Sequence, residues 1–185
     1  MDARWIGLAL YAAGVAMFVA GVFGIGGAFW GDYGSLPLAI VGAAILLAGL
    51  AALIWASRRN TVSRPHVFVL VVTAVAIALH AYESRLGDSE GSSLLFFLWP
   101  LAPYALCLIV SALSKSSIPA AAGAVTSLLF DLHAHNLVFV SPSSSTAGLA
   151  LFFVPLWNLL IYAPAAMVIA WFILRHRPQT NENAP

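Results

Sequence analysis

The chain has 185 residues, of which 62% are hydrophobic and only 8% are charged. Soluble domains carry about 25% charged residues, so this chain has too few polar side chains to cover the surface of a water-soluble monomer. Disordered chains are poor in apolar residues and rich in charge, which excludes disorder for most of the sequence. The composition therefore predicts an all-α protein, a polytopic bundle of transmembrane helices.

The net charge and the cysteine count exclude further classes. The formal net charge is +1, so the chain lacks the basic footprint of nucleic-acid-binding proteins, and no nucleic acid is expected as a partner. A single cysteine, Cys107, rules out an intrachain disulfide and a cysteine zinc cluster. The first apolar stretch is far longer than the ~7–15 residues of a signal-peptide core, so it is predicted to stay in the protein.

Six stretches are long enough to cross a bilayer, since a helix needs roughly 20 mostly apolar residues to span its hydrocarbon core. They comprise residues 5–29, 36–56, 65–82, 93–113, 118–132 and 147–174. The fifth stretch ends at Leu132 or continues to Val140. We expect residues 1–177 to form a single transmembrane domain and residues 178–185 to form a polar, disordered tail, with no room left for a soluble domain.

The basic residues gather on one side of this topology. If the N-terminus is cytoplasmic, all the basic residues but Arg85 fall in cytoplasmic segments. They are Arg4, Arg58, Arg59, Arg64, Lys115, Arg175 and Arg177. Cytoplasmic loops of membrane proteins are enriched in Lys and Arg, so the distribution predicts that both termini are cytoplasmic.

Ionisable residues occur at the outer ends of the third and fifth predicted spans. An ionisable residue within a span is costly, which makes it a candidate functional residue. His80 and Glu83 share one helix face, and so do Asp131 and His135, while His133 points elsewhere unless the chain is extended there. Histidines with carboxylates suit zinc or another divalent transition metal. A proton or ion relay, or simple solvation among the lipid headgroups, are the alternatives.

Haem ligation is a further alternative for the histidines. His66 and His80 are fourteen residues apart, which puts them about 21 Å apart on nearly the same face of one helix. His80 would pair with His133 or His135 at the outer side, and His66 with His176 at the inner side. We expect no cofactor, with a divalent metal or haem as the alternatives.

Prolines interrupt the fourth and sixth spans. Each proline removes a backbone hydrogen bond and bends the helix unless neighbouring groups compensate. If the two spans face each other, their bends would line a small cavity with Pro100, Pro103, Pro155 and Asn158. The alternative is that the bends are structural and that Asn158 makes a hydrogen bond between helices.

Small residues recur on one face of each of the first two spans. Gly42 and Gly49 are seven residues apart in the second span, and Gly14 lies in the first. Small residues let transmembrane helices approach closely. We expect them to pack the first span against the second, with a contact between two copies of the chain as the alternative.

The last quarter of the chain resembles a known group of sequences. It reads Ser-Ser-Ser-Thr-Ala-Gly-Leu-Ala over residues 143–150 and Val-Pro-Leu-Trp-Asn-Leu-Leu over residues 154–160. This pattern is similar to one found in small, uncharacterised, multi-pass proteins of the bacterial inner membrane. The resemblance implies the bacterial inner (cytoplasmic) membrane as the location, but no activity.

These observations favour a small integral membrane protein without enzymatic activity. It would act through contacts within the lipid bilayer, with a second copy or another membrane protein as its partner. The prolines and Asn158 support the first alternative, a subunit of a small-molecule or ion transporter or channel. The second alternative is a metal- or haem-binding membrane protein that uses the outer histidines. No catalytic residue is assigned, because the serine-rich stretch over residues 141–148, the candidate site for a nucleophile, lacks the pattern GxSxG.

Overall fold

The computed structural model describes residues 3–23, 36–58, 64–86, 94–141 and 147–176. All regular secondary structure within these ranges is helical. Residues 24–29 of the first predicted span, Ser143–Thr146 of the resemblance and the predicted tail, 178–185, lie outside the described residues. The all-α prediction is thus confirmed for the part of the chain that the structure covers.

The helices follow the predicted stretches within a few residues. The first five are α1 (Ala3–Phe23), α2 (Leu36–Arg58), α3 (Arg64–Leu86), α4 (Leu94–Leu113) and α5 (Ile118–His135). The π-helical turn η1 (Asn136–Val140) continues α5 without a break, so the longer alternative for the fifth span is the one observed. The last helix comprises the 3-10 turn η2 (Ala147–Leu149), α6 (Ala150–Trp157), the π-helical turn η3 (Asn158–Tyr162) and α7 (Ala163–Arg175).

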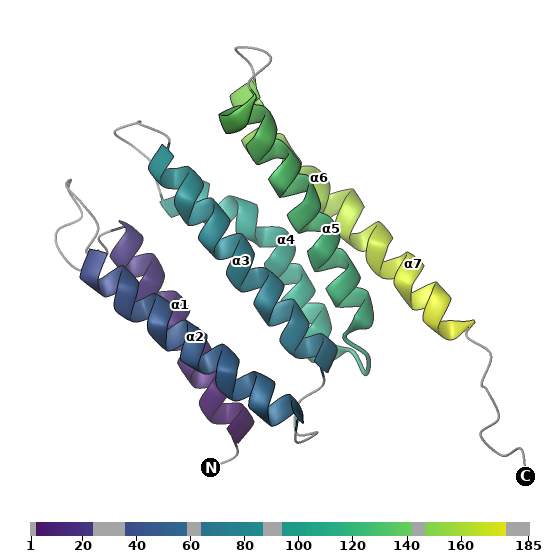
Figure 1. Cartoon of the computed structure of the whole chain (residues 1–185). Coiled ribbons are helices and arrows are strands. Elements are labelled where there is room, and N and C mark those ends of the chain that lie inside the picture. Colours follow the sequence, from purple (N-terminus) through teal and green to yellow (C-terminus); the bar gives the residue numbers. More distant parts are fainter. Residues whose placement is uncertain (1–2, 24–35, 59–63, 87–93, 142–146, 177–185) are drawn as a thin grey trace, which may run out of the picture.

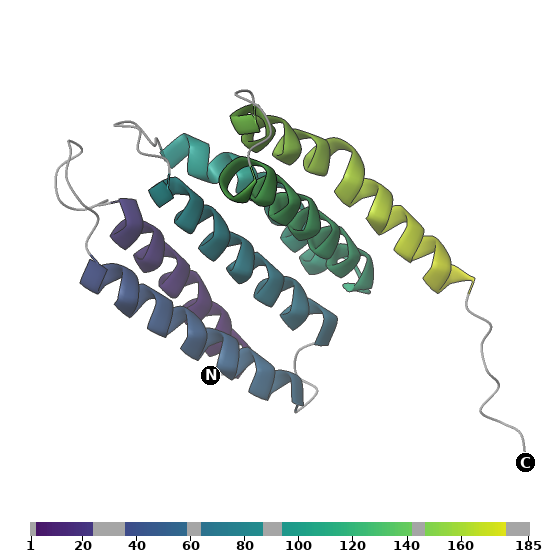
Figure 2. The same cartoon turned by 45° about the horizontal axis from the view of Figure 1, so that its top comes forward.

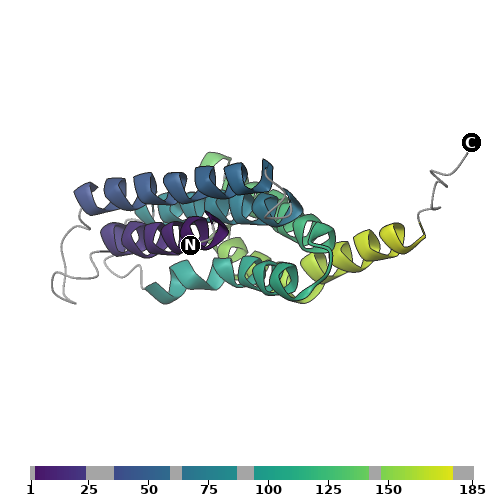
Figure 3. The same ribbon diagram turned by 90° about the horizontal axis from the view of Figure 1, so that it is seen from below.

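The helices alternate in direction and form two layers. One layer contains α2, α3 and α5, and the other contains α1, α4 and the continuous helix from α6 to α7 (Figures 1 and 3). The start of α1, the turn between α4 and α5 and the end of α7 lie at the same end of the bundle (Figure 1). Within the bundle, α5 packs against α3, α4, α6 and α7.

Three helices in the described part of the chain are long and apolar enough to cross a membrane. They are Arg64–Glu83, Ile118–Val140 and Ala147–Arg175. Shorter apolar helices cover Ile6–Ala20, Ile40–Ala56 and Phe97–Leu113. Large apolar side chains such as Leu47, Leu113 and Val168 are exposed, whereas His80 and Asp131 are buried. Apolar side chains outside and ionisable side chains inside are the reverse of the arrangement in a water-soluble protein. This distribution suits a surface that faces lipid.

Glycines bring α1 and α2 into backbone contact. Gly14, Gly42 and Gly49 are all buried between the two helices. A Cβ atom at any of the three would lie under 3.0 Å from backbone atoms of the facing helix, those of Leu46, Phe18 and Tyr11 respectively. The predicted packing of the first span against the second is confirmed.

Three apolar clusters hold the helices together, the smallest of which contains Ile77, Ala81 and Phe97. The largest joins α3, α4, α5 and α7 and includes Val69, Cys107, Ala124 and Met167. The third joins the α1–α2 pair to α3 and includes Leu50, Leu53 and Leu70. The Tyr11 hydroxyl donates a hydrogen bond of 3.1 Å to the carbonyl of Leu70, so α1 is also tied to α3 by a polar contact.

The prolines lie where the sequence predicted bends. Pro100 and Pro103 are inside α4, and Pro155 is inside α6. The last helix changes direction between α6 and α7, as Figure 2 shows. The two helices face each other: the Trp99 ring stacks on Phe152 with centroids 5.7 Å apart, and its Nε1 donates a hydrogen bond of 3.0 Å to the Phe152 carbonyl.

Candidate functional site

A buried polar cluster joins α3, α4, α5 and η3. We call it the carboxylate network and define it as His80, Glu83, Tyr104, Asp131, His135 and Asn158. All of its members except His135 are buried. Because they come from both layers of the bundle, the network links the layers through hydrogen bonds.

His80 stands between the two carboxylates. Its Nδ1 lies 2.7 Å from Oε2 of Glu83, three residues further along α3. Its Nε2 lies 3.2 Å from Oδ2 of Asp131 on α5. Both ring nitrogens therefore face carboxylate oxygens, and the imidazole bridges an acid on its own helix and one on a neighbouring helix.

Asp131 accepts hydrogen bonds from three helices. The Tyr104 hydroxyl of α4 donates to Oδ2 at 2.6 Å, and Asn158 Nδ2 of η3 donates to Oδ1 at 2.9 Å. The contact with His80 of α3 completes the set. Removing Asp131 would therefore leave polar groups on three different helices without their shared acceptor.

His135 forms the outer end of the network. Its Nδ1 lies 3.0 Å from Oε1 of Glu83, and its side chain keeps 18% of its surface exposed. The rings of Tyr82 and Phe139 flank it, with centroids 6.1 and 5.2 Å away. A hydrogen-bonded chain thus runs from a partly exposed imidazole through Glu83 and His80 to buried Asp131.

The contacts of His80 limit the protonation states that fit the geometry of the network. Each of the four carboxylate oxygens of Glu83 and Asp131 faces at least one nitrogen or hydroxyl group. A neutral imidazole has a single N–H, so contacts from both His80 nitrogens to ionised carboxylates need a doubly protonated ring. With His80 cationic and both acids ionised, the three side chains carry a net charge of −1, and protonation of His135 would neutralise it.

A π-helical turn places Asn158 beside Asp131. Asn158 is the first residue of η3, and Pro155 and Pro164 lie on either side of it. The turn is held from α5, where the ring of Phe130 stacks on that of Tyr162 with centroids 4.0 Å apart. π-Helical turns are rare and are often found at functional sites.

Two buried polar atoms beside the network have no hydrogen-bond partner among the described residues. They are the Ser127 hydroxyl oxygen and Oδ1 of Asn158. The two residues are in contact, because Asn158 Nδ2 also donates a hydrogen bond of 3.2 Å to the Ser127 carbonyl. Buried polar atoms of this kind commonly bind ordered water, so the polar region extends beyond Asp131.

The structure brings together four of the five residues predicted at the outer ends of the spans. Since α5 stays helical, Asp131 and His135 share a face and the side chain of His133 is exposed on another. The extended alternative, with Asp131 and His133 aligned, is therefore wrong. The placement of Asp131 at the end of its span is also wrong, because nine further helical residues follow it and extend about 13 Å.

The predicted metal and haem ligands are engaged in hydrogen bonds. No group of three or more His, Cys, Asp or Glu side chains is arranged to hold a metal ion in the described ranges. His66 Nδ1 lies 2.7 Å from the Ser111 hydroxyl, and His176 Nδ1 lies 2.9 Å from the Phe172 carbonyl. Ligation by His80 would require the loss of a carboxylate contact. The expectation of no cofactor, with a divalent metal or haem as the alternatives, stays a prediction.

Sequence reasoning missed two residues near Asp131. No motif in the sequence assigned a role to Tyr104 or to Ser127. The available signal was the position of Tyr104 in the middle of an apolar span, away from the interfaces where tyrosines gather. The hydrogen bond predicted for Asn158 between helices is present. Pro100, Pro103 and Pro155 are buried, and their role in lining a cavity stays a prediction.

Tyr104→Phe is expected to lower the free energy of unfolding by about 1.5–3 kcal/mol, the usual contribution of a hydrogen bond to a charged group. The substitution keeps the ring in the core and removes only the hydroxyl that donates to Asp131. Tyr82→Phe is the matched control, since Tyr82 is exposed. Thermal unfolding in detergent measures both, and equal stability of the two variants would contradict the prediction.

Comparison with known proteins gives no family for this chain: no family model, curated protein or solved structure matches it significantly.

Proposed function

We propose that the chain is a multi-pass protein of the bacterial inner membrane, with six spans in one transmembrane domain and both termini cytoplasmic. The six helices alternate in direction (Figure 1). Arg64, Lys115 and Arg175 lie at the end of the bundle where α1 begins, which supports a cytoplasmic assignment for that end. The resemblance of residues 143–160 to bacterial inner-membrane proteins supports the choice of membrane.

We further propose that the protein conducts protons across the membrane and that the carboxylate network is its proton-binding site. The observation that carries this proposal is the bridge from Glu83 through His80 to Asp131, buried within a bundle with a lipid-facing apolar surface. Chains of acidic residues and histidines inside membrane domains mark proton relays. Hydrogen bonds already join the groups that would exchange the proton.

Purely structural contacts explain this network less well. Burying a pair of charges costs so much desolvation energy that well-packed apolar residues are often at least as stabilising. Here two acids and a histidine are buried at 8% exposure or less. The two carboxylates that contact the imidazole also allow more than one arrangement of protons in the site. Several arrangements favour proton transfer and do not improve packing.

The proposed proton route begins at His135, the partly exposed end of the network. Protons pass to Glu83, His80 and then Asp131 along contacts of 3.2 Å or less. Beyond Asp131, an apolar cluster lies between the network and the opposite end of the bundle. The η3 turn, set between Pro155 and Pro164, is the proposed hinge that moves Asn158 and opens the inner half of the route.

His80→Gln is expected to slow proton flux at least about tenfold, since an uncharged amide cannot carry a proton between two carboxylates. The full chain is reconstituted into vesicles that contain a pH-sensitive dye, and a potassium diffusion potential drives proton entry. His133→Gln is the matched control, because His133 lies on α5 between Asp131 and His135 but is exposed and outside the network. We expect it to keep the flux of the unmodified protein.

Two results would refute the proposed function. One is a proton flux into vesicles with the unmodified protein that equals the flux into empty vesicles. The other is an equal flux through the His80→Gln and His133→Gln variants. Elemental analysis of the same purified protein tests the metal alternative, for which stoichiometric zinc lost on His80→Gln would be the supporting result.

A further inference from the structure

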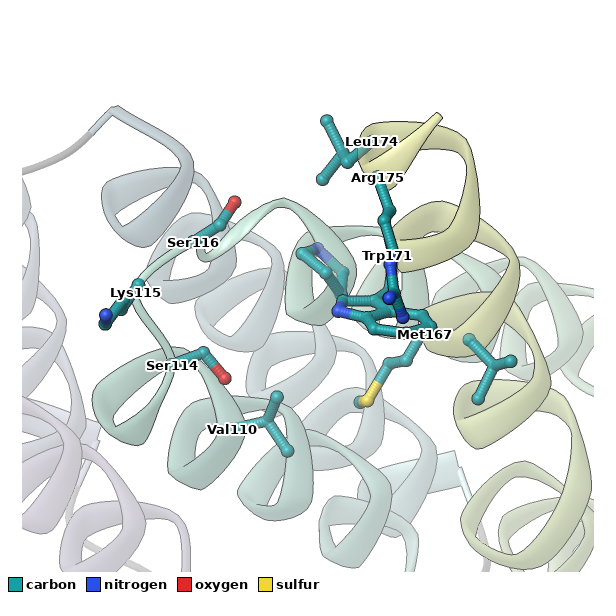
Figure 4. A pocket seen from close by; sticks show the side chains of 10 residues that line it. Val110, Ser114, Lys115, Ser116, Met167, Trp171, Leu174 and Arg175 are labelled. Carbon is teal, nitrogen blue, oxygen red and sulfur yellow. The ribbon is translucent and has the colours of Figure 1, made fainter. Parts of the chain in front are cut away.

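A groove of about 610 Å³ lies at the opposite end of the bundle from His135. Its walls are the end of α4, the turn into α5 and the last two turns of α7 (Figure 4). Figure 4 shows Lys115 and Ser116 on one side, with Trp171 and Arg175 on the other. The groove shares no residue with the carboxylate network.

The charged residues of the groove are all cationic. Lys115 and Arg175 line it, and none of its lining residues is acidic. The Arg175 guanidinium carbon lies 5.2 Å from the centroid of the Trp171 ring, a cation–π arrangement that keeps the charge beside the groove. The groove is therefore lined by two cationic side chains and by no acidic one, and the Lys115 ammonium lies on the side away from Trp171 and Arg175 (Figure 4).

The turn before α5 adds hydroxyl groups to the same end of the groove. Ser117 directly precedes the first residue of α5 and makes no side-chain cap. Its hydroxyl donates a hydrogen bond of 3.4 Å to the Ser111 carbonyl, whereas Ser116 Oγ accepts one of 3.4 Å from the Ile118 N–H. The Ser114 and Ser116 side chains are exposed and line the groove.

We propose that this groove binds one anionic phospholipid. Arg175, Lys115 and the hydroxyls of the turn hold the headgroup phosphate. Val110, Met167 and Val168 form an apolar wall that continues along the bundle and carries an acyl chain. Basic pockets between transmembrane helices at the cytoplasmic side are typical sites for anionic lipid headgroups. This proposal needs only that the helices lie in a bilayer and is independent of proton transfer.

The apolar wall distinguishes a lipid from a soluble phosphate compound. Val168 keeps 62% of its surface exposed and Trp171 keeps 50%, so this side of α7 faces the surroundings of the bundle. Tryptophan at the end of a transmembrane helix is typical of the headgroup level. A lipid would satisfy the cations and the apolar wall at once, whereas free phosphate would contact the cations alone.

The test is a titration of the detergent-solubilised full chain, followed by native mass spectrometry. The two probes are palmitoyl-oleoyl phosphatidylglycerol, which is anionic, and palmitoyl-oleoyl phosphatidylcholine, which has no net charge. We expect tighter binding of phosphatidylglycerol. Each of Lys115→Gln and Arg175→Gln should weaken it about fivefold, as expected for loss of one cation near an anionic headgroup. Excess inorganic phosphate should not displace the lipid.

Arg64→Gln is the matched control, because Arg64 is an exposed cation at the same end of the bundle but outside the groove. It should bind phosphatidylglycerol as the unmodified chain does. Unchanged thermal unfolding shows that each variant is folded. Equal binding of the two lipids, full binding by the Lys115→Gln/Arg175→Gln double variant, or displacement by inorganic phosphate would each overturn the proposal.

Discussion

Asp131→Ala is expected to lower the free energy of unfolding by about 3–5 kcal/mol, the cost of breaking a buried ion pair by removing one partner. Tyr104, Asn158 and His80 all contact this carboxylate. None of them can move into water, since each is at most 5% exposed. Their donors would stay buried without an acceptor, and proton flux should fall with the loss of the central acid. Thermal unfolding in detergent measures the change in stability.

Three further variants separate the causes of that loss. Asp131→Asn keeps the side-chain volume and removes the charge. If it lowers the free energy of unfolding less than Asp131→Ala does, the difference is due to the cavity that alanine leaves. His133→Ala lies two residues away on the exposed face of α5 and should change stability by less than about 0.5 kcal/mol. In the double variant Asp131→Ala/Tyr104→Phe, the second substitution should lower the free energy of unfolding much less than Tyr104→Phe does alone. The reason is that Asp131→Ala has already removed the acceptor of the Tyr104 hydroxyl. Additive effects would contradict the network.

Gly14→Ala is expected to destabilise the protein by about 1–3 kcal/mol, the usual cost of overpacking. The new methyl group would meet the backbone of Leu46, which cannot rotate away as a side chain can. Helix propensity alone would favour alanine over glycine by about 1 kcal/mol. A loss of stability would therefore show that backbone contact between α1 and α2 outweighs propensity. Thermal unfolding in detergent is again the measurement.

Two other glycines supply the controls. An added Cβ at Gly148 meets nothing within 4 Å, so Gly148→Ala should leave stability unchanged or slightly raised. At Gly123 the nearest atom is Cε of Met167, at 2.7 Å. A methionine end can adopt another rotamer, so Gly123→Ala should cost less than Gly14→Ala. If all three variants unfold alike, the proposed backbone contact does not limit stability.

The helices could be predicted from the sequence because their signal is composition over about twenty residues. The bend in the last helix could also be predicted, because a proline removes its own backbone hydrogen-bond donor wherever it stands in a helix. The exception was the end of the fifth span. Asn136 and the histidines before it lower the local hydropathy, so the sequence left the end of this span open between Leu132 and Val140, and the helix runs to Val140.

The carboxylate network could be predicted only in part. Spacing along one helix paired His80 with Glu83 and Asp131 with His135, because these distances are fixed by the helical repeat. The contact between His80 and Asp131 joins residues 51 positions apart and depends on how α3 and α5 are rotated against each other. Tyr104 was missed for this reason, since its role arises from the facing helix. The π-helical turn at Asn158 could not be predicted either, because no periodic pattern of residues in the sequence marks such a turn.

The spread of the network along the chain sets an order for biosynthesis. Its members extend from His80 to Asn158, so ribosomal synthesis delivers Asp131 before the helix that carries its last partner. Until α6 and η3 are synthesised and packed, the Asp131 carboxylate lacks the Asn158 donor. The α1–α2 pair, in contrast, can close as soon as both helices are synthesised, because its glycine contacts require no later residue. The last helix thus completes the network, and chains truncated before Asn158 should be less stable than the full chain.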